Sequence, residues 1–248
     1  MSTTSLEQED REQPALPSPS WYRHRGALFG LSIWVGCLVG YLLAALLHLP
    51  RLPIFALVEQ RYGPAGMRVV FAAALAVSAV GFWLRLWGAG YLASAVVWSR
   101  QAQAERLVVA GPFRHTRNPL YLGNLLLFTA FGVLVAPAAA VLLVVAGLLA
   151  LQACIAHEEK VLGRRFGAAF DAYCQQVPRL WPRLVPTARR SEHQFVGAEA
   201  LRSELGIAFW VLGWVLLLVG GRRWEWLFWV FLLAGLLWPR LFRRAIAV

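Results

Sequence analysis

Cysteine and charged side chains are scarce in this chain of 248 residues, and among the charged residues the 13 acidic ones are fewer than the 24 Lys and Arg. The three cysteines, Cys37, Cys154 and Cys174, lack the spacing of a metal or redox site, and their odd number argues against a disulfide framework. Charged residues make up only 15% of the sequence, and long apolar runs separate them. A soluble domain of this size would not carry so many such runs. The first twenty residues also lack the basic start and apolar centre of a signal peptide.

Long apolar runs are what the sequence does contain. Hydrophobic residues supply 59% of the chain, and many of the 12 tryptophans lie near the ends of the runs, as in the aromatic belts of a membrane protein. Six runs come close to the roughly 20 residues that cross a hydrocarbon core, and the third and fifth are short. They are Ala27–Leu49, Met67–Trp87, Pro119–Val135, Pro137–Ala156, Leu205–Val219 and Trp224–Trp238. The sequence therefore predicts an all-α, polytopic transmembrane bundle of about six spans.

The distribution of Lys and Arg predicts the orientation. Eighteen of these residues fall on the side that holds both termini and the two long central segments, and five fall on the other side. By the positive-inside rule, both termini are expected in the cytoplasm, and we expect a bacterial inner membrane. The net charge of +11 is explained by this orientation better than by nucleic-acid binding.

The chain is expected to divide into three parts. Residues 1–25 are polar and rich in Pro and Ser, which predicts a disordered cytoplasmic tail. Residues 26–186 form the membrane core, and 187–248 form a linker and a C-terminal transmembrane hairpin. Within the core, the apolar spacing over 160–177 predicts one amphipathic helix along the inner interface, ended by Pro178 and Pro182.

The stretch "GPFRHTRNPLYLGNLLLF", Gly111 to Phe128, places cations directly before an apolar run. Asn118 followed by Pro119 reads as a helix N-cap with proline at the first helical position. The first-turn N–H groups would then face the cytoplasm, where the helix dipole favours an anion, and Arg117 adds positive charge. Gly123, one turn in, allows close approach of a ligand or of a neighbouring helix. Positive-inside flanking with a good helix start is the simpler alternative.

Glu158 and Glu159 are expected to meet this helix start. Pro119 stands 18 residues before Pro137, and the two glutamates stand 21 and 22 residues after it, so a hairpin with a short outer turn returns both ends to about the same depth. Paired carboxylates beside a cationic helix start suit a zwitterionic ligand, and one of them could act as a general base. Simple ion pairs with nearby arginines are the alternative.

Arg85 lies inside the second span. At about 1.5 Å per residue it falls about 26 Å from Arg68 and near the inner interface. Snorkelling of the side chain is the first interpretation, and binding of a substrate headgroup is the second.

Three elements in this order resemble the integral membrane methyltransferases of the isoprenylcysteine carboxyl methyltransferase and phospholipid N-methyltransferase superfamily. They are "GPFRHTRNPLYLG", the Glu-Glu pair about forty residues later, and "FGAAFDAYCQQVPRLWP", and together they cover about residues 67–186. The resemblance implies S-adenosyl-L-methionine as methyl donor. By analogy its site is formed by Arg117, Asn118, Pro119, Tyr121, Gly123, Glu158 and Glu159, with Glu159 nearest the reaction, and Arg85 and Arg179 as weaker substrate-binding candidates.

The sequence departs from the family pattern at two positions. The prenylcysteine enzymes place an arginine five residues before the second glutamate, where this chain has Cys154, and this argues against carboxyl methylation of a prenylated C-terminus. Phe170 replaces the first tyrosine of the Phe-Gly element. The expected partners are membrane lipids and a lipidic or small amphipathic methyl acceptor. An NADPH-dependent membrane reductase of the sterol or steroid reductase type and a non-enzymatic scaffold are the alternatives.

Overall fold

The structure, a computed structural model, describes residues 19–92, 107–189 and 191–246, the last eight of them as backbone only. Within these ranges the chain is helical with connecting loops, which confirms the all-α prediction. The main helices are α3 (Arg25–Leu46), α4 (Ile54–Ala89), α6 (Pro119–Phe131), α7 (Pro137–Phe166), α9 (Gly197–Gly220) and α10 (Glu225–Ile246). Short elements are α2 (Ser20–Arg23), η1 (Gly111–Arg114), η2 (Gly132–Leu134), α8 (Ala168–Gln176) and η3 (Gly221–Trp224).

The long helices are long and apolar enough to cross a membrane, which indicates a multi-pass integral membrane protein. Among the described residues, four segments meet this description by length and composition: Arg25–Leu46, Ile54–Ala89, Pro137–Phe166 and Gly197–Trp238. The last contains both α9 and most of α10, and Pro119–Leu134 is a shorter apolar helix. The predicted spans follow these helices, although the first runs past the end of α3 at Leu46 and the third runs one residue past Leu134. A total of about six crossings stays a prediction.

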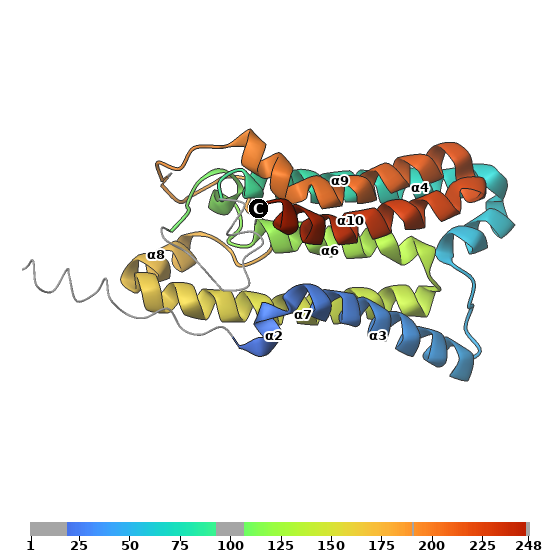
Figure 1. The fold of residues 1–248 in the computed structure, drawn as a ribbon. Coiled ribbons are helices and arrows are strands. Elements are labelled where there is room, and N and C mark those ends of the chain that lie inside the picture. Colours follow the sequence, from blue (N-terminus) through green and yellow to red (C-terminus); the bar gives the residue numbers. More distant parts are fainter. Residues whose placement is uncertain (1–18, 93–106, 190, 247–248) are drawn as a thin grey trace, which may run out of the picture.

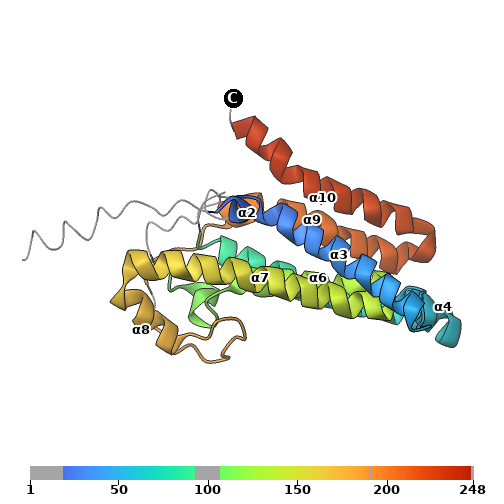
Figure 2. The same cartoon turned by 90° about the horizontal axis from the view of Figure 1, so that it is seen from below.

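The helices pack mainly in antiparallel pairs. α3 lies along α7, α4 along both α6 and α9, and α9 along α10 (Figure 1). Figure 2 shows α10 diverging from the bundle toward its C-terminus. The turn between α6 and α7 is short, because η2 follows α6 directly and ends at Leu134, and α7 begins at Pro137. The start of α6 and the end of α7 therefore lie at the same end of the bundle as α2 and α8, called the α8 end below.

Two predicted boundaries differ from the structure. The tail predicted over 1–25 ends earlier, because Ser20–Arg23 already form α2 and Arg25 begins α3; residues 1–18 lie outside the described part. The single interfacial helix predicted over 160–177 is instead the end of α7 followed by α8. Gly167 has a φ of 47°, and this left-handed backbone conformation ends α7 before α8 begins. α8 still buries its apolar face: Tyr173 is buried, and its hydroxyl donates to the Phe113 carbonyl at 2.7 Å.

Glycine allows the backbones of α3 and α7 to touch. A Cβ on Gly36 would lie 2.6 Å from the Leu143 Cα, which real Cβ atoms essentially never show. Close contact through small residues is the usual way in which helices associate in lipid. The α3–α7 contact matters for the site because α3 follows directly after α2, which reaches the end of α7.

Replacing Gly36 with valine is therefore expected to destabilise the protein by about 1–3 kcal/mol, because the two backbones must move apart. Gly30→Val is the matched control in the same helix, since a Cβ there would meet nothing within 4 Å. Thermal unfolding in detergent should show a lower midpoint for the first variant and a nearly unchanged midpoint for the second. Equal midpoints would contradict the packing.

Candidate functional site

The start of α6 is the first component of the site. Pro119 occupies the first helical position and Asn118 the N-cap position, as predicted, and the first intrahelical bond runs from the Leu122 N–H to the Asn118 carbonyl at 3.0 Å. The Asn118 side chain makes no capping bond, which corrects the expected cap. Its amide donates instead to the Arg179 carbonyl at 2.9 Å. Asn118 therefore ties the helix start to the segment that follows α8.

Further bonds join the same two segments. The Arg117 N–H donates to the Pro178 carbonyl at 2.9 Å, and the Thr116 hydroxyl donates to the Leu180 carbonyl at 2.9 Å. Thr116 is almost completely buried. These bonds hold the Val-Pro-Arg element at 177–179 against the start of α6. The side chain of Arg179 is thereby carried to the end of α7.

Glu158 lies between two tyrosines. The Tyr121 hydroxyl donates to its Oε1 at 2.6 Å, and the Tyr22 hydroxyl of α2 donates to the same oxygen. Burial, followed by the nearby Glu158 carboxylate, raises the pKa of the Tyr22 hydroxyl. Tyr22 therefore stays protonated and keeps its role as a donor. The result is a fixed acceptor oxygen that joins α2, α6 and α7.

Glu159 faces two arginines. The Arg179 Nε donates to its Oε2 at 2.9 Å, and the Arg117 Nε lies 3.4 Å from its Oε1. The second pair is close enough for an ion pair, yet both of its atoms are buried without a hydrogen-bond partner among the described residues. Arg179 also donates to the Gln152 side chain at 3.0 Å. Arg117, Arg179 and Glu159 thus form a charged cluster in which two buried polar atoms remain able to bond a ligand.

Arg85 is a residue of α4, and it contacts a different face of α6 from the one that carries Tyr121. Its Nε and Nη2 donate to the Glu204 carboxylate of α9 at 2.6 and 2.9 Å, and its Nη1 donates to the Asn124 side chain at 2.7 Å. The side chain is 8% exposed, so the snorkelling interpretation is wrong. A Cβ on Gly123 would lie 2.5 Å from the Arg85 Cγ, so Gly123 admits a neighbouring helix. Residues 121 and 123 point about 200° apart around a helix, which separates Arg85 from the glutamates.

The structure thus brings together most of the predicted site residues. Arg117, Asn118, Pro119, Tyr121, Glu158, Glu159 and Arg179 gather at the α8 end, whereas Arg85 and Gly123 serve the contact between α4 and α6. Sequence reasoning missed Tyr22 and Glu204. Tyr22 gave little signal, since it stands just after a polar stretch and bonds a residue 136 positions away. Glu204 did give a sequence signal, because an arginine inside a span needs an acidic partner and Glu204 stands at the start of an apolar run.

Replacing Tyr22 with phenylalanine is expected to lower stability by about 0.5–2 kcal/mol, because one hydrogen bond to a partly buried carboxylate is lost. Tyr121→Phe removes the other donor to the same oxygen. Since the two hydroxyls share one acceptor, the double variant should deviate from the sum of the single effects. Thermal unfolding in detergent of the three variants measures this coupling, and strict additivity would show that the hydroxyls act independently.

The fold and this cluster define a multi-pass helical membrane protein with a polar, charged cluster at one end of its bundle. Comparison with known families then gives a more specific assignment. Residues 69–169 match the model of the phospholipid methyltransferase family, which groups with the isoprenylcysteine-methyltransferase-like membrane methyltransferases, and the resemblance is confirmed over these residues. The matched segment includes the start of α6 and both glutamates. Tyr22, Arg179 and the α9–α10 hairpin lie outside it.

A curated relative is the nickel-cobalt-cadmium resistance protein NccN of Alcaligenes xylosoxydans xylosoxydans. It is 30% identical over 150 residues, which is 58% of this chain and 66% of that protein. The similarity thus spans slightly less than two thirds of the relative's length. No solved structure matches the chain.

Proposed function

We propose that this protein is an S-adenosyl-L-methionine-dependent methyltransferase that acts on a lipidic or small amphipathic acceptor at the membrane face where the α8 end lies. The observation that carries the proposal is the family match over 69–169 together with the meeting of Arg117, Tyr121 and the two glutamates inside that segment. The methyl donor is a soluble molecule, so this end would face the cytoplasm. The distribution of Lys and Arg supports the same orientation.

The charged cluster fits the amino-acid part of such a donor, which carries both an ammonium and a carboxylate. Glu159 offers its Oε1 to the ammonium, and Arg117 offers its Nε to the carboxylate, because these two buried atoms have no hydrogen-bond partner among the described residues. The N–H groups of Leu120 and Tyr121 precede the first intrahelical bond of α6, so they add donors for an anion. Asn118 and Pro119 fix the position of this turn.

The two glutamates would have separate tasks. Glu158 is held by two tyrosine hydroxyls and keeps α2, α6 and α7 together around the site. Glu159 is partly exposed at 19% of its side chain, so it can contact the bound molecules and accept a proton from the acceptor. S-adenosyl-L-methionine supplies an electrophilic methyl group on a sulfonium. The residues of the chain then have to align the acceptor in line with that group and exclude water.

Metal resistance is a property of the relative by its name and is not transferred to this chain. Among the described residues, no group of three or more His, Cys, Asp or Glu side chains could hold a metal ion. The proposal therefore rests on the methyltransferase match.

Donor binding tests the proposal directly. Purified protein in detergent is expected to show a higher thermal-unfolding midpoint with S-adenosyl-L-methionine than without it, because a ligand that binds only the folded state stabilises it. NADPH in the same assay is expected to give no shift. A shift with NADPH alone would favour the reductase alternative. No shift with either, and no saturable binding by calorimetry, would remove the enzymatic proposal.

The acceptor is identified by transfer of label. Membranes from an expressing strain, incubated with methyl-labelled donor, should yield a labelled lipid-soluble product by mass spectrometry. Membranes that contain the Glu159→Gln variant are the matched control, because the protein inserts in the same way but lacks the carboxylate proposed to contact the reactants. Equal labelling in both samples would exclude the assigned role of Glu159.

A further inference from the structure

The segment between α8 and α9 exposes large apolar side chains outside every candidate span. Trp181 is 70% exposed, Leu184 is 93% exposed and Val185 is 74% exposed. Neighbouring Leu180 is buried, so the segment has a side that packs on the protein and a side that faces away. Three large apolar residues presented together within five positions need a partner that removes them from water.

The backbone of this segment is held in place by several bonds. The Arg183 N–H donates to the His115 carbonyl at 3.0 Å, and the His115 Nδ1 lies 2.7 Å from the Arg183 carbonyl. The Arg183 side chain and the Thr187 hydroxyl both donate to the Gln176 carbonyl, at 2.9 and 2.8 Å. The exposed apolar side chains are therefore presented on a fixed loop.

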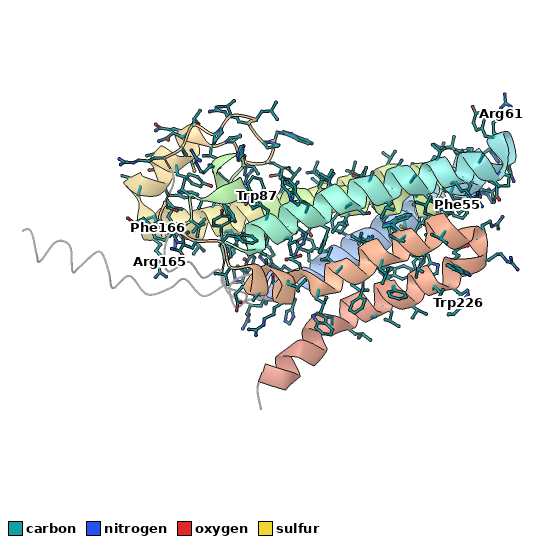
Figure 3. All side chains as sticks on the ribbon, turned by 90° about the horizontal axis from the view of Figure 1, so that it is seen from above. Phe55, Arg61, Trp87, Arg165, Phe166 and Trp226 are labelled. Atoms are coloured by element: carbon teal, nitrogen blue, oxygen red, sulfur yellow. The ribbon has the colours of Figure 1, made fainter. Side chains whose placement is uncertain are left out.

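The loop lies next to the membrane-facing surface of α4. The ring of His115, which bonds Arg183, lies 5.8 Å from the ring of Trp87, and Trp87 lies 4.9 Å from Trp83. Trp83 is 55% exposed on a helix that is long and apolar enough to cross the membrane. Figure 3 labels Trp87 at the end of α4, beside the segments of the α8 end. Tryptophans near the end of a span mark the depth of the lipid headgroups.

We propose that the loop 181–185 docks on the bilayer surface and inserts Trp181, Leu184 and Val185 at the boundary between headgroups and acyl chains. The partner is the lipid surface because the loop lies beside Trp83 and Trp87, which stand near the end of a helix that is long and apolar enough to cross the membrane. Charge supports this assignment, since exposed Arg183 and Arg189 stand beside the apolar residues and can meet lipid phosphates. Amphipathic segments bind membranes through this combination of apolar insertion and basic flanks.

Docking would set the depth of the candidate site. The loop follows Arg179 directly, and Leu180 accepts the hydrogen bond from Thr116 beside the start of α6. A loop fixed at headgroup depth therefore holds the Arg117–Glu159 cluster close to that depth. Provided that the proposed function holds, the acceptor would be a membrane-resident amphiphile whose reactive atom lies at the headgroup level, rather than in the bilayer centre or in free solution.

Fluorescence quenching from the lipid phase tests the docking. Leu184→Cys, in a background with Cys37→Ser and Cys174→Ser, is labelled with an environment-sensitive fluorophore, and the protein is placed in nanodiscs that contain lipids with a quencher just below the headgroup. Ala168→Cys is the matched control: it is exposed at the α7–α8 corner, which Figure 2 places beyond the ends of α4 and α6. The label at 184 is expected to emit at shorter wavelength and to be quenched at least about threefold more strongly than the label at 168. Equal quenching would overturn the proposal.

A second variant separates docking from the proposed function. Trp181→Ser, Leu184→Ser and Val185→Ser together should leave the Kd for S-adenosyl-L-methionine within about twofold, because these side chains are exposed whereas the open bonding atoms of the charged cluster are buried. Labelling of membrane lipids from methyl-labelled donor should fall several-fold. Unchanged labelling would overturn the assigned role of the loop in acceptor presentation. Wild-type protein that quenches as expected but binds no donor would leave the docking in place and remove the methyltransferase proposal.

Discussion

Glu204→Ala is expected to destabilise the folded bundle by about 3 kcal/mol or more, because removing one partner of a buried ion pair leaves the other charge uncompensated. Arg85 and Glu204 are bonded at 2.6 and 2.9 Å, and their side chains are 8% and 0% exposed. Asn124 and the Leu120 carbonyl would still accept hydrogen bonds from Arg85, which keeps the effect near the lower end of the usual range. Thermal unfolding in detergent measures the loss.

Two further variants serve as comparisons for the stability of Glu204→Ala. Glu199→Ala removes the half-buried partner of exposed Arg202, five residues earlier in α9 and at 3.6 Å, and is expected to cost about 1 kcal/mol at most. Arg85→Met combined with Glu204→Leu replaces both charges with apolar side chains and should be more stable than Glu204→Ala alone. Destabilisation equal to that of Glu199→Ala would show that the buried pair does not hold α9 on α4.

The hairpin gains a specific role from this pair. α9 lies outside the segment that matches the methyltransferase family, yet its Glu204 neutralises an arginine inside that segment. Arg85 also reaches the Leu120 carbonyl in the first turn of α6, at 3.4 Å. Arg85 therefore links the hairpin to the helix that begins at the candidate site. A second, looser contact joins the hairpin to the first turns of α4, where Arg222 of η3 meets Glu59 at 3.4 Å.

The part of the site that could be predicted from sequence depends on helix geometry. Pro119 stands 18 residues before Pro137, and the two glutamates stand 21 and 22 residues after it, so the two segments return to about the same level. The approach of Arg117 and Tyr121 to Glu158 and Glu159 therefore follows from residue counts and the rise per residue. Asn118 could be placed at the N-cap position because it directly precedes a proline that suits the first helical position. Its side-chain bond to Arg179 could not, because it depends on where a segment 61 residues away returns.

The features that sequence reasoning missed depend on tertiary packing. Tyr22 follows a polar stretch and becomes buried because α2 packs on α7, where the ring of His157 lies 4.4 Å from the Tyr22 ring. Gly167 adopts a positive φ, which a helical apolar pattern does not reveal because glycine occurs in both conformations. Arg85 was interpreted from its depth alone, whereas its environment is decided by a carboxylate 119 residues later.

Glu159→Gln is expected to weaken binding of S-adenosyl-L-methionine by about 10- to 100-fold, because a charge-assisted hydrogen bond is replaced by a neutral one. Gln keeps the size of the side chain and can still accept from Arg179, so the fold should remain intact. The two arginines would then stand beside a neutral group, which favours the donor's carboxylate but removes the partner of its ammonium. Calorimetric titration measures the change in Kd.

Lys160→Gln is the control for this experiment, since it neutralises an exposed charge on the next residue of the same helix. Its Kd should stay within about twofold of the wild-type value, because an exposed charge is screened by solvent and salt. If both variants bind equally well at unchanged thermal stability, Glu159 has no part in donor binding. The charged cluster would then be a structural link between α7 and the Val-Pro-Arg element, because Arg179 donates to Glu159 at 2.9 Å.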